Sequence, residues 1–482
     1  MIIRRAFPCI ILCIQAIVAW KAPAEYAVTP SGNGRFLQTA SGAPFFWQAD
    51  TAWLLFHRLN YTEAELYLSD RAHKGFTVVL AVGFTQIGID SPNRNGDLPF
   101  IDKDVNQPNE AYWAYVDSII ELAWKKGIRV CMVPAWGNYV HDSANSPGVL
   151  NTNTAPAFGR FIGHRYPYLP KTLVADTNPC HGGVPPTYEV TDWSPVYDAL
   201  ANGIVAGERQ AIAEAGRASP STWWPLMTMH PTNQWFQGGP LALAHAFFGN
   251  RSWLTLDTSQ SGHTDHPPNP PIPWWNCRRG WEPVELMYAA GSNAGGRIFS
   301  GAAGITYGAN AVWQMAIPGT FASDGSGPSN DWRSDLLLPG SGQMQWIQKA
   351  VLGRGTKSFF QRVPAPEIII GDPGTDDSRV MAMRDGNDRW IMVYSPKGMA
   401  FRIDTSRLSS CRVQAHWYNP LTGESISVKY GACGTQYLKQ FTPPRDDQDW
   451  VLMLERVIQT GCIVTTADST DNQSMIPGIN SF

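Results

Sequence analysis

Several features that mark common protein classes are missing from this 482-residue sequence. Charged residues make up only 16% of the chain and the formal net charge is -3, so we expect neither a nucleic acid nor an anionic membrane surface as a partner. The sequence has no Walker phosphate-binding loop, no G-x-S-x-G nucleophile elbow and no H-E-x-x-H zinc motif. We therefore expect no metal and no cofactor.

Long apolar runs are scarce as well. The N-terminal run, Ala6 to Ala19, follows Arg4 and Arg5 and is too short to span a bilayer. A charged start followed by a short apolar run is typical of a signal peptide, which we assign to residues 1–19. The mature protein is therefore expected to be secreted, with no membrane segment.

Six of the eight cysteines lie beyond the predicted signal, too widely spaced for a zinc pattern. Cys131 lies in an apolar strand pattern, which predicts a buried free thiol. In an oxidising compartment, Cys411 with Cys433 is the most credible disulfide and Cys180 with Cys277 a weaker one. Three sequons are compatible with N-glycosylation if the source is eukaryotic, at Asn60, Asn250 and Asn472.

Predicted strands and helices alternate through the first two thirds of the chain. Apolar, β-branched strands such as Phe76 to Val82 and Ile128 to Val133 are separated by helices such as Glu110 to Lys126. This alternation predicts a parallel sheet, and its length suits an α/β fold of the (β/α)8 TIM-barrel type over residues 25–355. Ser252 to Leu256 is the expected sixth strand. The segment from Trp281 to Ala290 is either a helix or the seventh strand.

The pattern changes after Gly353. Short strands, among them Val380 to Met383, Trp390 to Tyr394 and Ile368 to Gly371, are separated by turn groups rich in Gly, Asn and Asp. Closely spaced strands of this kind predict a small all-β sandwich domain over residues 360–455. Residues 456–482 are expected to form a flexible tail.

Carboxylates occur where predicted strands end. Asp50, Asp176 and Asp257 follow such strands, and Glu285 does so if its segment is a strand. Catalytic groups of parallel barrels lie at these ends, although an Asp there can also simply cap a turn. Two carboxyl groups can cleave a glycosidic bond when one donates a proton and the other attacks or activates water.

Aromatic and polar side chains accompany these acids, as expected for a carbohydrate partner. Indole faces stack on the apolar faces of sugar rings, and His and Gln bind their hydroxyl groups. The predicted substrate-binding residues are Asp50, Trp53, Trp136, His230, Trp235, Gln260, His263, Tyr307 and Trp313. The oligomeric state is left open.

A family resemblance supports this interpretation. The chain resembles the apiosidase-like glycoside hydrolases, secreted barrels often followed by a domain named for collagen binding. The matching motifs include Phe46 to Trp53, Ala175-Asp176-Thr177-Asn178-Pro179, Gln260 to His263, Gly301 to Gly308, and Trp417 to Glu424. The resemblance implies a retaining mechanism on a polysaccharide, with plant cell-wall pectin that carries apiose as its suggested substrate.

The resemblance also implies catalytic roles. It assigns Asp176 as acid/base and places the nucleophile, a Glu, after the seventh strand. Glu285-Leu286-Met287-Tyr288 matches that motif imperfectly, so the nucleophile is Glu285, Glu282 or absent. The alternative function is a catalytically degenerate carbohydrate-binding or adhesion protein.

Overall fold

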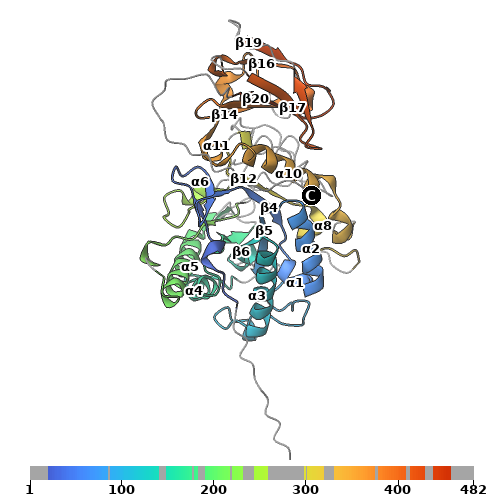
Figure 1. The fold of residues 1–482 in the computed structure, drawn as a ribbon. Coiled ribbons are helices and arrows are strands. Elements are labelled where there is room, and N and C mark those ends of the chain that lie inside the picture. Colours follow the sequence, from blue (N-terminus) through green and yellow to red (C-terminus); the bar gives the residue numbers. More distant parts are fainter. Residues whose placement is uncertain are drawn as a thin grey trace, which may run out of the picture.

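The computed structural model describes most of the chain between Trp20 and Val457. The described residues are 20–84, 87–140, 148–175, 179–182, 190–217, 220–231, 244–258, 298–299, 301–319, 330–374, 378–408, 413–428 and 438–457. They form a barrel-like α/β domain and an antiparallel β domain, with helices α10 and α11 between the two (Figure 1). The predicted fold class is confirmed.

The wall of the α/β domain is a parallel sheet with strand order β11-β7-β6-β5-β4-β12, in which β8 also pairs with β6. Pairing of β12 with β4 joins the last described strand to the first, as in a closed barrel. The strands are β4 (Trp47–Thr51), β5 (Val78–Phe84), β6 (Arg129–Trp136), β7 (Lys171–Thr172), β8 (Val174–Ala175), β11 (Met227–Thr228) and β12 (Gly304–Tyr307).

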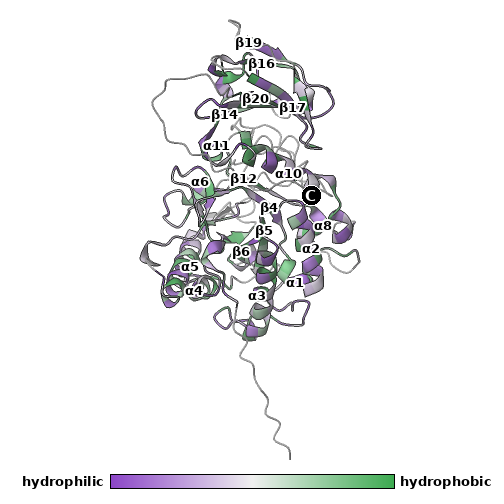
Figure 2. Ribbon diagram, in the orientation of Figure 1, coloured by the Kyte–Doolittle hydropathy of each residue, from purple (hydrophilic) through white to green (hydrophobic). Residues whose placement is uncertain are grey.

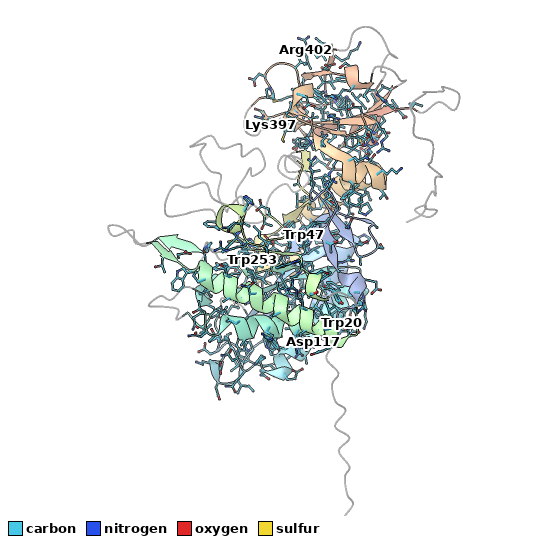
Figure 3. The ribbon with its side chains drawn as sticks, turned by 90° about the vertical axis from the view of Figure 1, so that its left-hand side faces the viewer. Trp20, Trp47, Asp117, Trp253, Lys397 and Arg402 are labelled. Carbon is cyan, nitrogen blue, oxygen red and sulfur yellow. The ribbon has the colours of Figure 1, made fainter. Side chains whose placement is uncertain are left out.

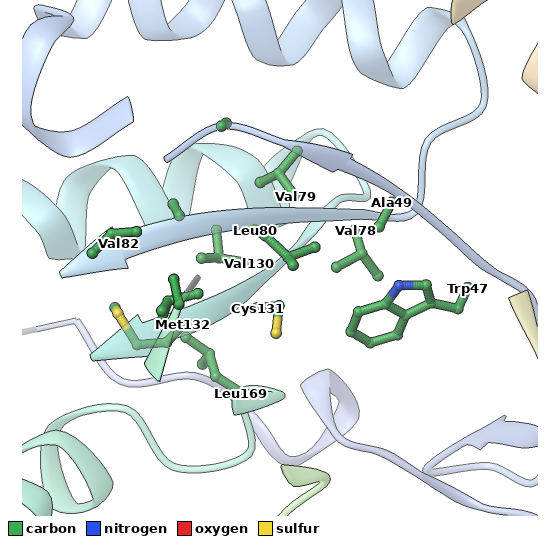
Figure 4. Packing of buried hydrophobic residues seen from close by; sticks show 14 of the residues in the cluster. Trp47, Ala49, Val78, Val79, Leu80, Val82, Val130, Cys131, Met132 and Leu169 are labelled. Atoms are coloured by element: carbon green, nitrogen blue, oxygen red, sulfur yellow. The ribbon is translucent and has the colours of Figure 1, made fainter. Parts of the chain in front are cut away.

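Strand β5 and most of β6 are buried on both faces, which explains their unbroken apolar sequences. Figure 4 shows their side chains packed together with Trp47 of β4. Cys131 lies within this packing as a buried free thiol, as predicted, and burial raises its pKa to about 12. The other proposed disulfide partners lie outside the described side chains.

Helices lie around the sheet and carry both hydrophilic and hydrophobic residues (Figure 2). Asn60 begins α2 with a capping box, in which its side chain accepts from the Glu63 N–H and Glu63 accepts from the Asn60 N–H. The helices are α1 (Leu55–Arg58), α2 (Tyr61–His73), α3 (Glu110–Lys125), α4 (Ala155–Arg165), α5 (Ser194–Glu214), α6 (Ala244–Phe248), α8 (Asn310–Trp313), α9 (Trp332–Asp335), α10 (Pro339–Leu352) and α11 (Thr356–Gln361).

Two small antiparallel sheets lie outside the wall. One precedes the barrel and consists of β1 (Val28–Pro30), β2 (Leu37–Thr39) and β3 (Pro44–Phe45). The other is a hairpin in the connection after β8, made by β9 (Cys180–Gly182) and β10 (Val190–Asp192). Neither sheet interrupts the parallel order of the barrel strands.

The β domain contains a six-stranded sheet in the order β13-β14-β15-β20-β17-β18 and a β16–β19 pair. Alternate residues of β15 pack on opposite sides: Met392 and Tyr394 join the core of the barrel, whereas Ile391 and Val393 join a core with β16. The strands are β13 (Arg362–Pro364), β14 (Met381–Asp385), β15 (Trp390–Ser395), β16 (Phe401–Asp404), β17 (Val413–Tyr418), β18 (Ser425–Val428), β19 (Leu438–Phe441) and β20 (Trp450–Arg456). The central strand β15 is therefore buried on both faces. Figure 3 shows the side chains of the β domain and of the barrel from the side.

Two predicted strands were wrong. Residues 251–258 form turns and bends, although the N–H groups of Thr255 and Leu256 both donate to the Met227 carbonyl. The Leu254 N–H donates to the Arg251 carbonyl at 3.2 Å, so the first half of the segment is a turn and not a strand. Ile368 to Gly371 likewise forms a short 3-10 turn and a single bridge from Ile369 to Ile403, because Pro366 starts a turn there.

Candidate active site

The carboxyl ends of the barrel strands bring three of the predicted ligand-binding side chains together. Trp53 follows β4, Trp136 ends β6 and His230 follows β11. The Trp53 ring lies 5.7 Å from the Trp136 ring and 5.2 Å from the His230 ring, with edge-to-face geometry in both pairs. Because β4 and β11 are separated by three strands in the sheet order, Trp53 extends across the mouth of the barrel.

Backbone hydrogen bonds hold Trp53 in this position. The Val82 N–H donates to the Trp53 carbonyl at 3.2 Å, and the Leu54 N–H donates to the Trp313 carbonyl at 3.3 Å. On the β12 side, the Thr51 hydroxyl donates to the Tyr307 carbonyl at 2.9 Å. The turn after β4 is thus attached to β5 and to α8, and these bonds hold the backbone that carries Trp53.

The same edge of the sheet leads into the predicted acid/base. Ala175 is the register partner of Trp136, and the His230 N–H donates to the Val174 carbonyl at 3.2 Å. Asp176 is the next residue in the sequence after Ala175. The mouth is therefore assembled around the point where β8 ends.

Five predicted site residues lie outside the described residues. They are the two catalytic candidates and three binding candidates, namely Asp176, Glu285, Trp235, Gln260 and His263. Their predicted roles stay predictions.

Asp50 does not fit its predicted role in substrate binding. Its carboxylate is fully buried, accepts a hydrogen bond from the Tyr67 hydroxyl at 2.7 Å and forms an ion pair with Arg71 at 2.8 Å. Tyr67 and Arg71 belong to α2, so Asp50 faces the helix layer and not the mouth. Burial raises the pKa of this carboxyl, and the Arg71 charge opposes that shift. We assign Asp50 a structural role.

Tyr307 is likewise corrected, and Asp257, a carboxylate candidate by its position, has a capping role. Tyr307 is 2% exposed, and its ring packs against Phe76 and the Arg71 guanidinium behind the wall. Asp257 is exposed and accepts from the His245 N–H at 2.9 Å, so that it caps the start of α6. Strand position alone did not reveal which way these side chains point.

Trp313, a predicted binding residue, is buried at the end of α8. Two polar side chains close to it in the sequence were overlooked in the sequence analysis. Asn310 and Gln314 are almost completely buried, and the Gln314 amide donates to the Asn310 side chain. The Arg58 guanidinium donates to the Gln314 carbonyl at 2.8 Å. Their spacing of four residues around Ala311-Val312-Trp313 was a signal for a polar face on an otherwise apolar helix.

The described part of the mouth supplies aromatic faces and an imidazole. No group of three or more His, Cys, Asp or Glu side chains that could hold a metal occurs among the described residues. Within the same residues, no helix is long and apolar enough to cross a membrane. An aromatic mouth of this kind suits a sugar ring, whose apolar faces pack on indole.

Comparisons with known proteins agree with this geometry. The family model "Apiosidase-like, catalytic domain" matches residues 31–295 and 292–357, and "Putative collagen-binding domain of a collagenase" matches residues 363–455. A search of curated proteins found no match.

Two solved structures are similar over most of their length. A glycoside hydrolase is 25% identical, with a TM-score of 0.72 over 90% of this chain and 98% of that one. A family 5 glycoside hydrolase from Bacteroides vulgatus is 26% identical, with a TM-score of 0.73 over 89% of this chain and 94% of that one.

Proposed function

The chain belongs to the family of apiosidase-like catalytic domains, and from that premise we propose that it is a secreted, retaining glycoside hydrolase. The family match and the two similar structures support a glycoside hydrolase in general. The proposal adds the mechanism, the substrate and the location. The substrate is a polysaccharide, with apiose-bearing pectin of plant cell walls as the first candidate.

One observation carries the proposal. Trp53, Trp136 and His230 converge at the carboxyl ends of three barrel strands, next to the end of β8, from which the chain continues into Asp176. An acid within an aromatic site has a raised pKa, as proton donation to a leaving group requires. We therefore assign Asp176 as acid/base and Glu285 as nucleophile.

Substitution of Asp176 tests the first role. Asp176→Asn should lower kcat/KM by ~10²–10⁴-fold on substrates with poor leaving groups, and by much less on activated aryl glycosides that need no proton. Asp257→Asn is a matched control, because Asp257 caps α6 and should be dispensable for turnover. Equal losses on both kinds of substrate would contradict an acid/base role.

The nucleophile requires its own test. If Glu285 is competent, its carboxyl lies about 5–5.5 Å from that of Asp176, the spacing of retaining enzymes. Glu285→Gln should then abolish turnover of an activated glycoside, whereas Glu282→Gln should not. The anomeric form of the first product, observed by NMR, should match that of the substrate.

The binding or adhesion alternative makes the opposite prediction. If the segment around Glu285 is a helix on the outer wall, no second carboxylate reaches the mouth, and hydrolysis is absent or very weak. No turnover of any glycoside by the parent protein, combined with retained polysaccharide binding, would favour that alternative. Secretion is tested by N-terminal sequencing of protein recovered from medium, which should begin near Trp20.

A further inference from the structure

A cleft whose lining includes none of the mouth residues Trp53, Trp136 and His230 lies between α10 and the barrel-facing side of the β-domain sheet. Figure 1 shows where these two elements meet. The volume of the cleft is about 290 Å³. Its walls include Trp346, Lys349, Arg354, His416, Tyr418 and Met453. Clefts of this size at domain interfaces are common places for small ligands to bind.

Two cations line the cleft with little compensating charge. The Arg354 side chain is 15% exposed and forms an ion pair with Glu455. Lys349 is exposed, its ammonium lies 4.2 Å above the Trp346 ring, and it donates to the Gln345 side chain. Among the described residues, Glu455 is the one carboxylate in an ion pair with either cation. The pair of cations therefore leaves an excess of positive charge.

Burial shifts the pKa values of two groups in the cleft. Burial lowers the pKa of Arg354 to about 10, although Glu455 is its partner. Burial and then the Arg354 charge lower the pKa of His416, so its imidazole is kept neutral beside the guanidinium. An anion in the cleft would offset the cost of the buried cation.

The aromatic wall of the cleft is fixed in place. The Tyr418 hydroxyl donates to the Trp346 carbonyl at 2.9 Å, which joins β17 to α10. Gly423, with a φ of 76°, lies so close that an added β-carbon would be 2.4 Å from the Trp346 ring. The walls are thus formed before any ligand binds, which lowers the entropy cost of binding.

We propose that this cleft is an accessory binding site for a carboxylate-bearing saccharide, separate from the barrel mouth. The carboxylate binds between Lys349 and Arg354, and the sugar ring lies along the edge of the Trp346 ring, whose faces are next to Lys349 and Gly423. The anionic part of the proposal depends only on the charges of the cleft. The saccharide part rests on the proposed function, since a polysaccharide-cleaving enzyme gains affinity from a second contact with its substrate.

Calorimetric titration of the full chain tests the site with three probes: D-glucuronate, D-glucose and inorganic phosphate. We expect D-glucuronate to bind, with D-glucose and phosphate at least about fivefold weaker. Lys349→Met should weaken D-glucuronate binding by about tenfold, since a charge-assisted hydrogen bond is lost. Lys125→Met on α3, which removes the same charge from an exposed site far from the cleft, is the matched control.

Arg354→Gln is a second variant, with its folding checked by circular dichroism. Loss of binding in both cleft variants but not in Lys125→Met or Asp176→Asn supports the accessory site and separates it from catalysis. Equal affinity for D-glucuronate and D-glucose would overturn the role of charge. Equal affinity for phosphate and D-glucuronate would overturn the assignment of a saccharide as the ligand. If D-glucuronate does not bind, or if it still binds after both cleft substitutions, the proposal of an accessory site in this cleft is overturned.

Discussion

The carboxylate of Asp50 and the guanidinium of Arg71 lie 2.8 Å apart, with neither side chain exposed to solvent. This ion pair connects the end of the first barrel strand, β4, to α2. The Arg71 guanidinium also lies over the rings of Tyr67, Phe76 and Tyr307. Because Tyr307 belongs to β12, a single buried cation contacts both strands that meet where the barrel closes.

We therefore predict that Asp50→Asn destabilises the protein severely. Removing one partner of a buried ion pair leaves the other charge uncompensated and costs about 3–5 kcal/mol of unfolding free energy. Tyr67→Phe removes only one hydrogen bond to the same carboxylate and should cost about 1.5–3 kcal/mol. Urea denaturation measures both values. A loss of activity in Asp50→Asn with unchanged stability would instead favour a direct role for Asp50 in the site.

The pH dependence of stability should report on His57. This imidazole is 7% exposed and contacts the Ser91 hydroxyl at 3.3 Å, and burial followed by the Arg58 charge lowers its pKa to about 4. The unfolded chain binds a proton below about pH 6.5, whereas the folded chain does not until about pH 4. Stability should therefore fall as the pH drops from 6.5 to 4, by up to about 3 kcal/mol.

Comparison with His57→Gln isolates this contribution from the other titrating groups. Denaturation midpoints measured at pH 7 and pH 5 should differ less in His57→Gln than in the parent. His73→Gln, which removes an exposed histidine of α2, should keep the parent's dependence. An identical pH response in parent and His57→Gln would show that the imidazole does not titrate as its burial implies.

Glycines hold α4 and α5 in unusually close contact. A β-carbon at Gly163 would be 2.1 Å from the Ile204 carbonyl oxygen, and one at Gly203 would be 2.5 Å from the Pro156 carbonyl oxygen. Gly163→Ala should therefore force the helices apart and cost about 2 kcal/mol or more, despite the better helix propensity of Ala.

Gly342→Ala in α10 is the matched control, because a β-carbon there has nothing within 4 Å. That substitution should leave stability unchanged or raise it by about 0.5–1 kcal/mol. Thermal unfolding of the two variants should move in opposite directions. Equal shifts would mean that the helices separate at little cost.

The fold was largely predictable from the sequence, because its strongest signals are local. The apolar β-branched run of β5 predicted a buried strand, and the helix predicted over Glu110 to Lys126 is observed as α3. The side of the barrel wall on which the Asp50 and Tyr307 side chains lie was not predictable in the same way. In a parallel barrel both strand faces are buried, so no polar alternation indicates which side of the wall a given residue occupies.

The candidate site was predictable only in outline. Trp53, Trp136 and His230 were predicted as substrate-binding residues, a role that stays a prediction, and the structure brings their three rings together. Asn310 and Gln314 were missed because they belong to no known motif. Their spacing of four residues was the only signal in the sequence. The glycine pairs of α4 and α5 were also visible as four-residue repeats, yet only the packing shows that two helices meet along them.

The remaining prediction separates the binding role of Trp136 from the structural role of Trp53. Trp136 is partly exposed at the end of β6, whereas Trp53, its partner in the edge-to-face ring contact, is only 7% exposed. Trp136→Ala should lower kcat/KM on polysaccharide about tenfold through the loss of stacking, with little change in stability. Trp53→Ala should instead cost about 3–5 kcal/mol of unfolding free energy, because it empties buried volume.

Trp224→Ala is the matched control for Trp136. Trp224 is 38% exposed and precedes β11, so it lies at the opposite end of the barrel strands from the mouth. Its replacement removes the same indole without touching the proposed sugar path, and kinetics should be unchanged. If Trp136→Ala and Trp224→Ala behave alike on polysaccharide, or if Trp136→Ala loses stability as Trp53→Ala does, the aromatic mouth is structural. The sugar must then bind elsewhere on the barrel.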